Sequence, residues 1–549
     1  MSKGRREGRR KFWGWGLEGQ GPSLEQQRGI AKTLAARFGP GAADAAGLAF
    51  EPTPPPTVDE IELPVPRLSP PTALAAICSA DPWDRAGHTY GKSFRDVVRG
   101  YARDFRPAPD LVAFPRDEEE IAALLDWCSD ARAAAIPYGG GSSVVGGVEA
   151  DVGAGYAGAV SIDLGRLDRV VEIDRSSRAA RIQAGVLGPA LEDQLRPHGL
   201  TLRHFPQSFE FSSLGGWIAT RSGGHYATTY THIEDFLESL RAVTPRGVLE
   251  SRRLPGSGAG PSPDRMFAGS EGILGIITEA WMRLQDRPSF RAQASVRFPG
   301  EGGFLAGARV VRTLSQAGLH PANCRLLDAR EAETSGAAPG DASVLIVGFE
   351  SADHPLDPWM DRALEIARDG GGEVPEGAGR TRTGSGAPRD GAAGAWRSAF
   401  LNMPYLRDAL VGMGVVSETF ETAITWDRFE AFHAETMSAT SDAVARICGA
   451  GQVACRFTHV YPDGPAPYYS VIAPGRRGSL LEIWADVKAA ASEAVIQAGG
   501  TITHHHAVGR DHRPWYDAQR PTLFADALRA AKKELDPASI LNPRVLLDP

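Results

Sequence analysis

Three polar, glycine-containing segments between residues 137 and 278 constrain the fold more than any other feature of the chain. Glycine lets the backbone adopt left-handed conformations and approach a ligand closely, which leaves N–H groups able to point at an anion. One such segment is often a structural turn, but three are difficult to explain as unrelated turns. Together they predict a site for a pyrophosphate-containing cofactor. The segments are Pro137-Tyr138-Gly139-Gly140-Gly141-Ser142-Ser143, Gln207-Ser208-Phe209-Glu210-Phe211-Ser212-Ser213-Leu214-Gly215-Gly216-Trp217 with its continuation Thr220-Arg221-Ser222-Gly223, and Gly269-Ser270-Glu271-Gly272-Ile273-Leu274-Gly275-Ile276-Ile277-Thr278.

Two better-known phosphate-binding motifs are excluded by single positions. The Rossmann dinucleotide fingerprint requires a glycine where Val144 stands. A P-loop at Gly91-Lys92-Ser93 requires a leading glycine, and Ala86 occupies that place. The predicted cofactor site therefore relies on oriented backbone amides and serine hydroxyls in a different fold.

The patterns around these segments favour an α+β fold over a regular doubly wound sheet. Residues 111–114 are typical of a short strand, and residues 117–128 are typical of a helix that begins at Asp117 and has one apolar face. Alternating runs at 170–174 and 180–184 flank a turn-rich segment and predict an antiparallel pair. A glycine- and proline-rich stretch at 369–394 is either a mobile lid or a disordered insertion, and both interpretations stay open.

Composition limits the class of protein. The 549 residues are enough for two or three domains, and the net charge of -8 argues against a general nucleic-acid binder. Five scattered cysteines without CxxC spacing predict a reducing compartment, and no apolar run is long enough to cross a membrane. The basic residues within 3–11 predict a solvated tail or a contact with an anionic membrane surface. We therefore expect a cytoplasmic protein, with peripheral membrane contact as the alternative for its N-terminus.

Three consecutive histidines, His504, His505 and His506, follow the alternating segment 500–503. If this segment is a strand, His504 and His506 point to one face and His505 points to the other. One metal ion could not then collect all three side chains, and no Cys or carboxylate cluster with ligand spacing accompanies them. We predict no metal, and phosphate binding and proton handling remain open for the triplet.

The order and the sequences of the three glycine segments resemble the flavin domain of the vanillyl-alcohol-oxidase-type, or PCMH-type, FAD proteins. The segment Leu535-Asp536-Pro537-Ala538-Ser539-Ile540-Leu541-Asn542-Pro543 resembles the C-terminal return segment of that superfamily. The resemblance implies FAD held between two α+β subdomains, an α+β cap domain, and, because residues 137–147 contain no histidine, a non-covalent flavin. The residues that it implies for FAD binding are Pro137, Tyr138, Gly139, Gly140, Gly141, Ser142, Ser143, Gln207, Ser208, Ser212, Ser213, Gly216, Thr220, Arg221, Ser222, Gly223, Glu271, Gly272, Gly275, Ile276 and Ile277.

Further segments resemble the alkyldihydroxyacetonephosphate synthase (alkylglycerone-phosphate synthase) family. They are Phe12-Trp13-Gly14-Trp15-Gly16, Val243-Thr244-Pro245-Arg246-Gly247, Arg325-Leu326-Leu327-Asp328, Tyr405-Leu406-Arg407-Asp408, Ser417-Glu418-Thr419-Phe420-Glu421-Thr422, the stretch from Cys455-Arg456 to Tyr468, and the histidine triplet. This resemblance implies an FAD-dependent transferase of ether-lipid biosynthesis, which exchanges the acyl group of 1-acyl dihydroxyacetone phosphate for a fatty alcohol through a flavin N5 adduct. An FAD-linked dehydrogenase or oxidase of a 2-hydroxy acid or alcohol, and a catalytically silent flavin- or lipid-binding protein, remain the alternatives.

The same resemblance implies roles for a small set of residues. Tyr468 is the expected acid/base at C1 of the substrate, with His505 and His506 assisting proton transfer and His504 in support. Arg407 and Arg325 are the expected ligands of the substrate phosphate, because a guanidinium group offers a dianion several donors. We expect a homodimer with no nucleic-acid partner. The expected regions are an N-terminal helical, membrane-proximal region at 1–106, a PCMH-type FAD-binding domain at 107–285, a cap and substrate domain at 286–500, and a return segment completing the flavin site at 501–549.

Overall fold

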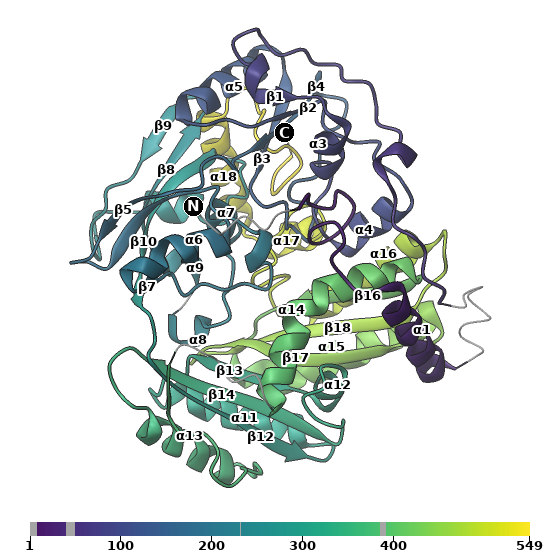
Figure 1. Cartoon of the computed structure of the whole chain (residues 1–549), viewed down its shortest axis with the longest axis vertical. Helices are drawn as coiled ribbons and strands as arrows, with labels where there is room; N and C mark the ends of the chain where they lie inside the picture. Colours follow the sequence, from purple (N-terminus) through teal and green to yellow (C-terminus); the bar gives the residue numbers. More distant parts are fainter. Residues whose placement is uncertain (1–7, 40–49, 231, 385–390, 549) are drawn as a thin grey trace.

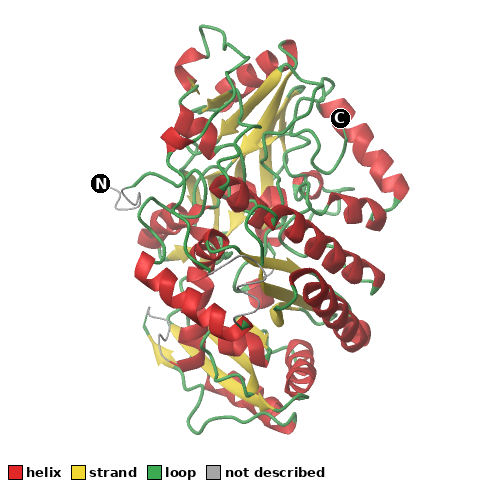
Figure 2. Cartoon of the chain, turned by 90° about the vertical axis from the view of Figure 1, so that its right-hand side faces the viewer, coloured by secondary structure: helices red, strands yellow, loops and turns green. Residues whose placement is uncertain are grey.

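The chain folds into two halves, each with its own sheet or sheets (Figure 1). The computed structural model describes residues 8–39, 50–230, 232–384 and 391–548. The upper half of Figure 1 contains sheets formed from residues 78–283, and the lower half contains a sheet formed from residues 290–474. Figure 2 shows helices flanking the strands of both halves. The predicted α+β class is confirmed.

The N-terminal region combines short helices with long extended segments. Ser23 caps its first helix by accepting a hydrogen bond from the Gln26 N–H. The prediction of a solvated basic tail is wrong for Arg10 and Lys11, because Arg10 donates to the Gly140 carbonyl and Lys11 is buried. Residues 1–7 lie outside the described part. The helices are α1 (Leu24–Phe38), η1 (Val58–Glu60), η2 (Ala75–Ile77), α3 (Pro82–Gly87) and α4 (Phe94–Tyr101).

The first sheet has the order β1-β2-β4-β3, and β2, β4 and β3 are parallel. Helix α5 (Glu118–Asp130) covers it with the predicted apolar face, and the Asp117 side chain caps this helix by accepting from the Glu120 N–H. The Glu120 carboxylate does not cap the helix in return, since it accepts from the backbone N–H and the Nε of Arg116. The strands are β1 (Cys78–Ser79), β2 (Leu111–Ala113), β3 (Ala133–Tyr138) and β4 (Gly158–Asp163).

The second sheet is antiparallel, with the order β5-β6-β10-β8-β9. Its first two strands are the predicted pair, with the turn that the sequence indicated between them. A two-stranded ribbon of β7 and β11 accompanies the sheet. The elements are β5 (Val170–Asp174), β6 (Ala179–Gln183), α6 (Gly188–Leu195), η3 (Arg196–His198), β7 (Leu200–Thr201), η4 (Phe209–Phe211), α7 (Leu214–Thr220), α8 (Ala227–Tyr230), α9 (Ile233–Phe236), β8 (Leu237–Thr244), β9 (Gly247–Glu250), α10 (Pro263–Phe267), β10 (Ile276–Arg283) and β11 (Gln285–Asp286).

The third sheet has the order β15-β12-β14-β13-β17-β18-β16. Part of the expected insertion at 369–394 is ordered, because β15 pairs with β12 and α14 begins at Gly391. Residues 385–390 lie outside the described part. The elements are β12 (Phe290–Pro299), α11 (Gly303–Gln316), β13 (Asn323–Leu327), α12 (Ala329–Thr334), β14 (Ala342–Ser351), α13 (Asp357–Asp369), β15 (Arg382–Thr383), α14 (Gly391–Gly412), β16 (Val415–Glu421), α15 (Trp426–Cys448), β17 (Gln452–Val460), β18 (Pro465–Pro474) and α16 (Leu480–Gln497).

The C-terminal segment, yellow in Figure 1, returns from the lower sheet to the upper half. It contains α17 (Arg513–Gln519) and α18 (Thr522–Leu535), and Leu541 then bridges in parallel to Ala135 on β3. No helix among the described residues is both long and apolar enough to cross a membrane.

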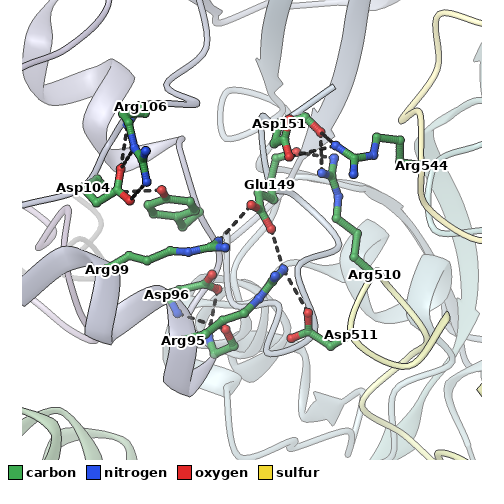
Figure 3. A network of polar contacts seen from close by, with 12 residues as sticks. Arg95, Asp96, Arg99, Asp104, Arg106, Glu149, Asp151, Arg510, Asp511 and Arg544 are labelled. Carbon is green, nitrogen blue, oxygen red and sulfur yellow. Dashed lines mark hydrogen bonds and ion pairs between the residues drawn. The ribbon is translucent and has the colours of Figure 1, made fainter. Parts of the chain in front are cut away.

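A network of ion pairs joins this return segment to the N-terminal region (Figure 3). The Arg95 guanidinium on α4 pairs with Glu149, which follows the first glycine segment, and with Asp511 at 2.9 Å. Arg99 also pairs with Glu149, at 2.9 Å, and Arg510 donates to the Glu149 backbone carbonyl at 2.8 Å. Buried ionic networks are costly to leave incomplete, so these three segments are held in one arrangement.

Candidate functional site

A cavity of about 310 Å³ lies where the glycine segments, the seven-stranded sheet and the return segment meet. All the residues that the sequence implied for FAD binding line it except Arg221. The structure does not place Arg221 in the site that the sequence implied for it. Its side chain is 62% exposed and pairs with Glu234 at 2.8 Å, and it does not line the cavity. Of the implied catalytic and phosphate-binding residues, the cavity is lined by Tyr468, His505, His506, Arg325 and Arg407.

The first glycine segment is built so that only glycine fits it. A Cβ on Gly140 would lie 1.8 Å from the Phe211 carbonyl oxygen, and one on Gly139 would lie 2.1 Å from Ser213 Oγ. Gly141 has a φ of 62°, in the left-handed region. The first two glycine segments are therefore packed backbone to backbone along the cavity, which is the cradle that a long pyrophosphate cofactor needs.

The N-terminal segment closes one side of this cradle. Arg10 donates to the Gly140 carbonyl at 2.6 Å, and Trp15 lines the cavity. The Trp15 N–H donates to the Asp408 carboxylate on α14 at 2.5 Å. The Trp-Gly-Trp-Gly segment therefore connects the cofactor cradle with the helix that carries Arg407.

Glu271, in the third glycine segment, anchors the return segment. Its carboxylate accepts from the N–H groups of Val508 at 2.9 Å and Gly509 at 2.8 Å. Burial raises the pKa of Glu271 to about 7, although these two hydrogen bonds oppose the rise. Both oxygens of this carboxylate are therefore already occupied by the chain, although the residue lines the cavity.

The histidine triplet lies in a bend and not at the end of a strand, which corrects the predicted alternation. Ala507 follows with a φ of 72°, a conformation that ends any extended run. The backbone N–H groups of His504, His505 and His506 instead converge on the Glu421 carboxylate at the end of β16, at 2.6, 3.1 and 2.9 Å. Thr503 Oγ1 also donates to this carboxylate, at 2.5 Å.

The surroundings of Glu421 keep it ionised. Burial alone would raise its pKa, but His505 and His506 nearby and a hydrogen bond from His505 hold the pKa well below its usual value. Burial lowers the pKa values of His504 and His506 well below the ordinary range, although Glu421 opposes this for both. Neutral imidazoles beside a charged carboxylate can both donate and accept protons.

Three ring nitrogens, from His459, His504 and His505, lie within 4.8 Å of one another. His504 Nδ1 and His505 Nδ1 are 3.0 Å apart and share a hydrogen bond, so only one of these two nitrogens presents a lone pair in this arrangement. The geometry therefore describes a hydrogen-bonded cluster, and the absence of a metal stays a prediction.

Tyr468 on β18 faces the histidines across the cavity. Its ring centroid lies 6.2 Å from that of His505 and 5.5 Å from that of His506. The guanidinium of Arg456 lies 3.8 Å from the Tyr468 ring centroid and is held by Glu331 at 2.5 Å. Burial raises the pKa of Tyr468, and the Arg456 charge opposes that rise. Arg456 lies in the stretch from Cys455 to Tyr468 that resembles the family, but the sequence pattern implied no role for it.

The two implied phosphate ligands differ in their surroundings. Arg325 is 1% exposed, donates to His225 Nδ1 at 2.9 Å and stacks on Trp396 at 4.4 Å, but its Nε and Nη1 have no partner among the described residues. Burial, and next the Arg456 charge, lower the pKa of Arg325 to about 9. Arg407 pairs with Asp408 at 3.1 Å and its Nε lacks a partner in the described part of the chain. Both groups can therefore accept an anion.

Two buried lysines also line the cavity, and the sequence patterns did not assign them to a site. Lys92 is 3% exposed, its Nζ donates to the Phe12 carbonyl at 3.4 Å, and burial lowers its pKa to about 8. Lys488 pairs with Glu418 at 3.1 Å. No local pattern distinguishes such residues from surface lysines, because their burial depends on contacts far away in the sequence.

Comparison with known proteins shows which families contain similar sequences and folds. Residues 109–251 match the family described as FAD binding domain, and residues 287–546 match FAD linked oxidases, C-terminal domain. Alkyldihydroxyacetonephosphate synthase of Dictyostelium discoideum is 30% identical over 84% of this chain and 77% of that protein, and that of Trypanosoma brucei brucei is 29% identical over 85% and 78%. Glycolate oxidase subunit GlcD of Bacillus subtilis (strain 168) is 26% identical over 80% and 89%.

Comparison with solved structures also identifies alkyldihydroxyacetonephosphate synthase as a similar protein. A structure of alkyldihydroxyacetonephosphate synthase superposes with a TM-score of 0.80 at 25% identity, over 97% of this chain and 98% of that chain. p-Cresol methylhydroxylase superposes with a TM-score of 0.65 at 15% identity, over 86% and 95%, and shares the fold alone.

Proposed function

The chain belongs to the alkyldihydroxyacetonephosphate synthase family of FAD-dependent enzymes, and from that premise we propose that it exchanges the acyl group of 1-acyl dihydroxyacetone phosphate for a long-chain alkoxy group. In this exchange the bond between C1 and the acyl oxygen breaks, and a bond between C1 and the alcohol oxygen forms. The acyl group leaves as a carboxylate and the alcohol loses its hydroxyl proton, so substrate and product have the same oxidation state.

One observation carries this proposal. The buried Arg325 guanidinium, with two nitrogens that lack partners among the described residues, lines the same cavity as the glycine segments, Tyr468 and the histidine loop. A buried cation of this kind needs an anionic partner, and a phosphate dianion suits the planar donor set of arginine. We assign Arg325 and Arg407 to the substrate phosphate, with the charge of Lys92 adding to the positive potential of the cavity.

FAD would be held without a covalent bond. Its site would consist of the glycine segments, the serines beside them and the N-terminal segment around Arg10, which bonds to the Gly140 carbonyl. When bound, FAD supplies an electrophilic ring at which the substrate carbon can be activated. Tyr468, aided by the Arg456 charge, would remove and return the proton at C1. His505 and His506 would exchange protons with Tyr468 and the incoming alcohol. His504 does not line the cavity and would support them through its hydrogen bond to His505.

The test is an anaerobic mixture of purified holoprotein with 1-acyl dihydroxyacetone phosphate. We expect free fatty acid to appear and ether product to form once a long-chain alcohol is added. A flavin that is bleached instead by 2-hydroxy acids and restored by an electron acceptor would contradict the proposal. It would favour an FAD-linked dehydrogenase, the second candidate, which the likeness to the glycolate oxidase subunit supports.

Three further expectations, for the domains, the oligomeric state and lipid contact, extend the proposal to the whole protein. Residues 107–285 would form the flavin-binding domain, 286–500 the substrate domain, and 501–549 the segment that completes the site. The protein would act as a homodimer, and the basic residues that precede Arg10 would contact lipid surfaces. Size-exclusion chromatography with light scattering tests the dimer, and vesicle sedimentation tests the lipid contact.

A further inference from the structure

A line of hydrogen bonds leads from the cavity toward the outside of the protein. His505, which lines the cavity, bonds through Nδ1 to His504 Nδ1 at 3.0 Å. His504 Nε2 bonds to the Tyr461 hydroxyl at 2.9 Å, and that hydroxyl bonds to His232 Nε2. His232 stands at the start of α9 and is partly exposed, and the nearby Arg221 side chain is 62% exposed. The four side chains therefore form a line of hydrogen bonds from the cavity to a partly exposed residue.

We propose that His505, His504, Tyr461 and His232 form a proton relay between the reaction site and solvent. The proposal rests on the proposed function, because an acyl-for-alkoxy exchange releases one proton in each turnover. The alcohol enters with its hydroxyl proton, and the acid leaves as a carboxylate, which at neutral pH lies far above the pKa of a carboxyl group. The cavity must therefore dispose of one proton each time it turns over.

The partners at each end of this line set the positions of its protons. The Glu421 carboxylate can only accept, and its Oε2 lies 3.4 Å from His505 Nδ1, so this nitrogen carries the proton. His505 Nε2 is then a lone pair, and the described residues offer it no hydrogen-bond partner. At the other end, burial lowers the pKa of His232, while the Glu234 charge and a hydrogen bond to the Arg221 backbone oppose this. Nε2 of His232 is bonded to the Tyr461 hydroxyl, so Nδ1 is left for the backbone hydrogen bond and carries the proton of the neutral ring.

The proton positions on His504 and Tyr461 follow from those on His505 and His232. Nδ1 of His504 accepts from His505, so the proton of His504 lies on Nε2 and is donated to the Tyr461 oxygen. The Tyr461 hydroxyl in turn donates to His232 Nε2. Each link holds one proton, and every donor points outward, away from the cavity.

Proton transfer along this line balances at every step. A proton from the reaction binds His505 Nε2, and the Nδ1 proton of His505 moves to His504 Nδ1. The Nε2 proton of His504 moves to Tyr461, the hydroxyl proton of Tyr461 moves to His232 Nε2, and the Nδ1 proton of His232 leaves to solvent. After these steps each imidazole carries its proton on the opposite nitrogen, so the three rings and the Tyr461 hydroxyl must turn before the next turnover. Glu421 favours the arrangement in which His505 again carries its proton on Nδ1.

The charges around the line suit this role. Burial raises the pKa of Tyr461 well above its ordinary value, and Glu234, Glu421, Asp463 and Asp235 raise it further, so it stays a phenol that can pass a proton on. Burial lowers the pKa of His459, whose ring lies 5.0 Å from that of His504 and 5.8 Å from that of His232. A neutral His459 adds no positive charge that would repel a proton in transit.

Tyr461→Phe tests the central link, because it removes the hydroxyl and keeps the ring. A pH indicator reports proton release during a single turnover, and quenched samples report fatty acid. In the wild type the two should rise together, whereas in Tyr461→Phe proton release should slow by about tenfold or more, since one acid–base group typically contributes about 10²–10⁴-fold. Tyr469→Phe is the matched control, since Tyr469 is buried on β18, close to Tyr461 in the sequence, and its hydroxyl faces His433 at 3.3 Å, outside the relay.

His232→Ala tests the outer end. Removing this ring should slow proton release, and added imidazole should restore it in a concentration-dependent way, which a merely structural defect would not show. Wild-type turnover with unchanged proton release in both variants, or a His232→Ala defect that imidazole does not relieve, would overturn the relay. A wild-type protein that releases no fatty acid would instead contradict the proposed function, so the two failures are distinguishable.

Discussion

Replacing Glu421 by glutamine tests whether one buried carboxylate holds the histidine loop. Oε1 of Glu421 accepts from Thr503 Oγ1 at 2.5 Å and from the N–H groups of His505 at 3.1 Å and His506 at 2.9 Å. Oε2 accepts from the His504 N–H at 2.6 Å. An amide keeps one acceptor but turns the other oxygen into an NH₂ group, which faces a backbone N–H.

The size of the effect follows from these contacts. One lost hydrogen bond to a charged group costs about 1.5–3 kcal/mol, and the unpaired donors add desolvation, so we estimate about 3 kcal/mol in total. If this energy controls the opening of the loop, hydrogen exchange at residues 504–506 should accelerate by about 150-fold. Mass spectrometry of a peptide that spans these residues measures the change.

The matched control is Glu418→Gln, on the same strand. Glu418 is also nearly buried, but its carboxylate binds Trp484 and Lys488 and does not touch the loop. It should leave exchange at 504–506 unchanged. If Glu421→Gln also leaves exchange unchanged while the protein retains FAD, the carboxylate does not hold the loop and the reasoning is refuted.

Three further predictions concern the cavity itself. Tyr468→Phe should retain FAD, judged by the ratio of flavin to protein absorbance, and lower fatty-acid release by at least about 100-fold; undiminished release would exclude Tyr468 as the acid/base. Gly140→Ala should abolish FAD retention because its Cβ would meet the Phe211 carbonyl, whereas Gly155→Ala, in open space, should retain the cofactor. Lys92 loses its charge as the pH rises through its pKa of about 8, so affinity for the phosphorylated substrate should fall between about pH 7 and pH 9. In Lys92→Met this pH dependence should disappear and affinity at pH 7 should fall by about tenfold, as titration calorimetry would measure.

Much of the flavin-binding half could be predicted from sequence because its signals are local. Glycine segments, the helix capped by Asp117 and the antiparallel pair at 170–183 are each set by neighbours within a few residues. Arg221 shows the limit of this reasoning. It lies inside a glycine segment whose other implied residues line the cavity, but it follows the last residue of α7 in a left-handed conformation, and its exposed side chain pairs with Glu234.

The histidine loop was misread for a physical reason. Alternation in the segment 500–503 resembles a strand, but no strand in the described part of the chain pairs with it. Glu421, about eighty residues earlier, supplies the acceptor for the N–H groups of the histidines that follow. Backbone groups must be paired wherever the chain is buried, and a carboxylate can do this as well as a sheet. A local pattern cannot reveal that partner, just as it cannot reveal the guanidinium of Arg456 over Tyr468.

The histidine loop is the point where three parts of the molecule are joined. Glu421 attaches it to the seven-stranded sheet, and Glu271 attaches the adjoining residues 508 and 509 to the third glycine segment. Asp511 attaches it to Arg95 on α4, and through Glu149 to the loop after the first glycine segment (Figure 3). Each anchor is a carboxylate that binds a separate region, so displacement of the cap sheet or of the N-terminal helix shifts the loop itself. The positions of His505 and His506 over the cavity therefore depend on both halves of the protein at once, so the proton transfer that we propose for them should be sensitive to how the cap is seated on the flavin-binding domain.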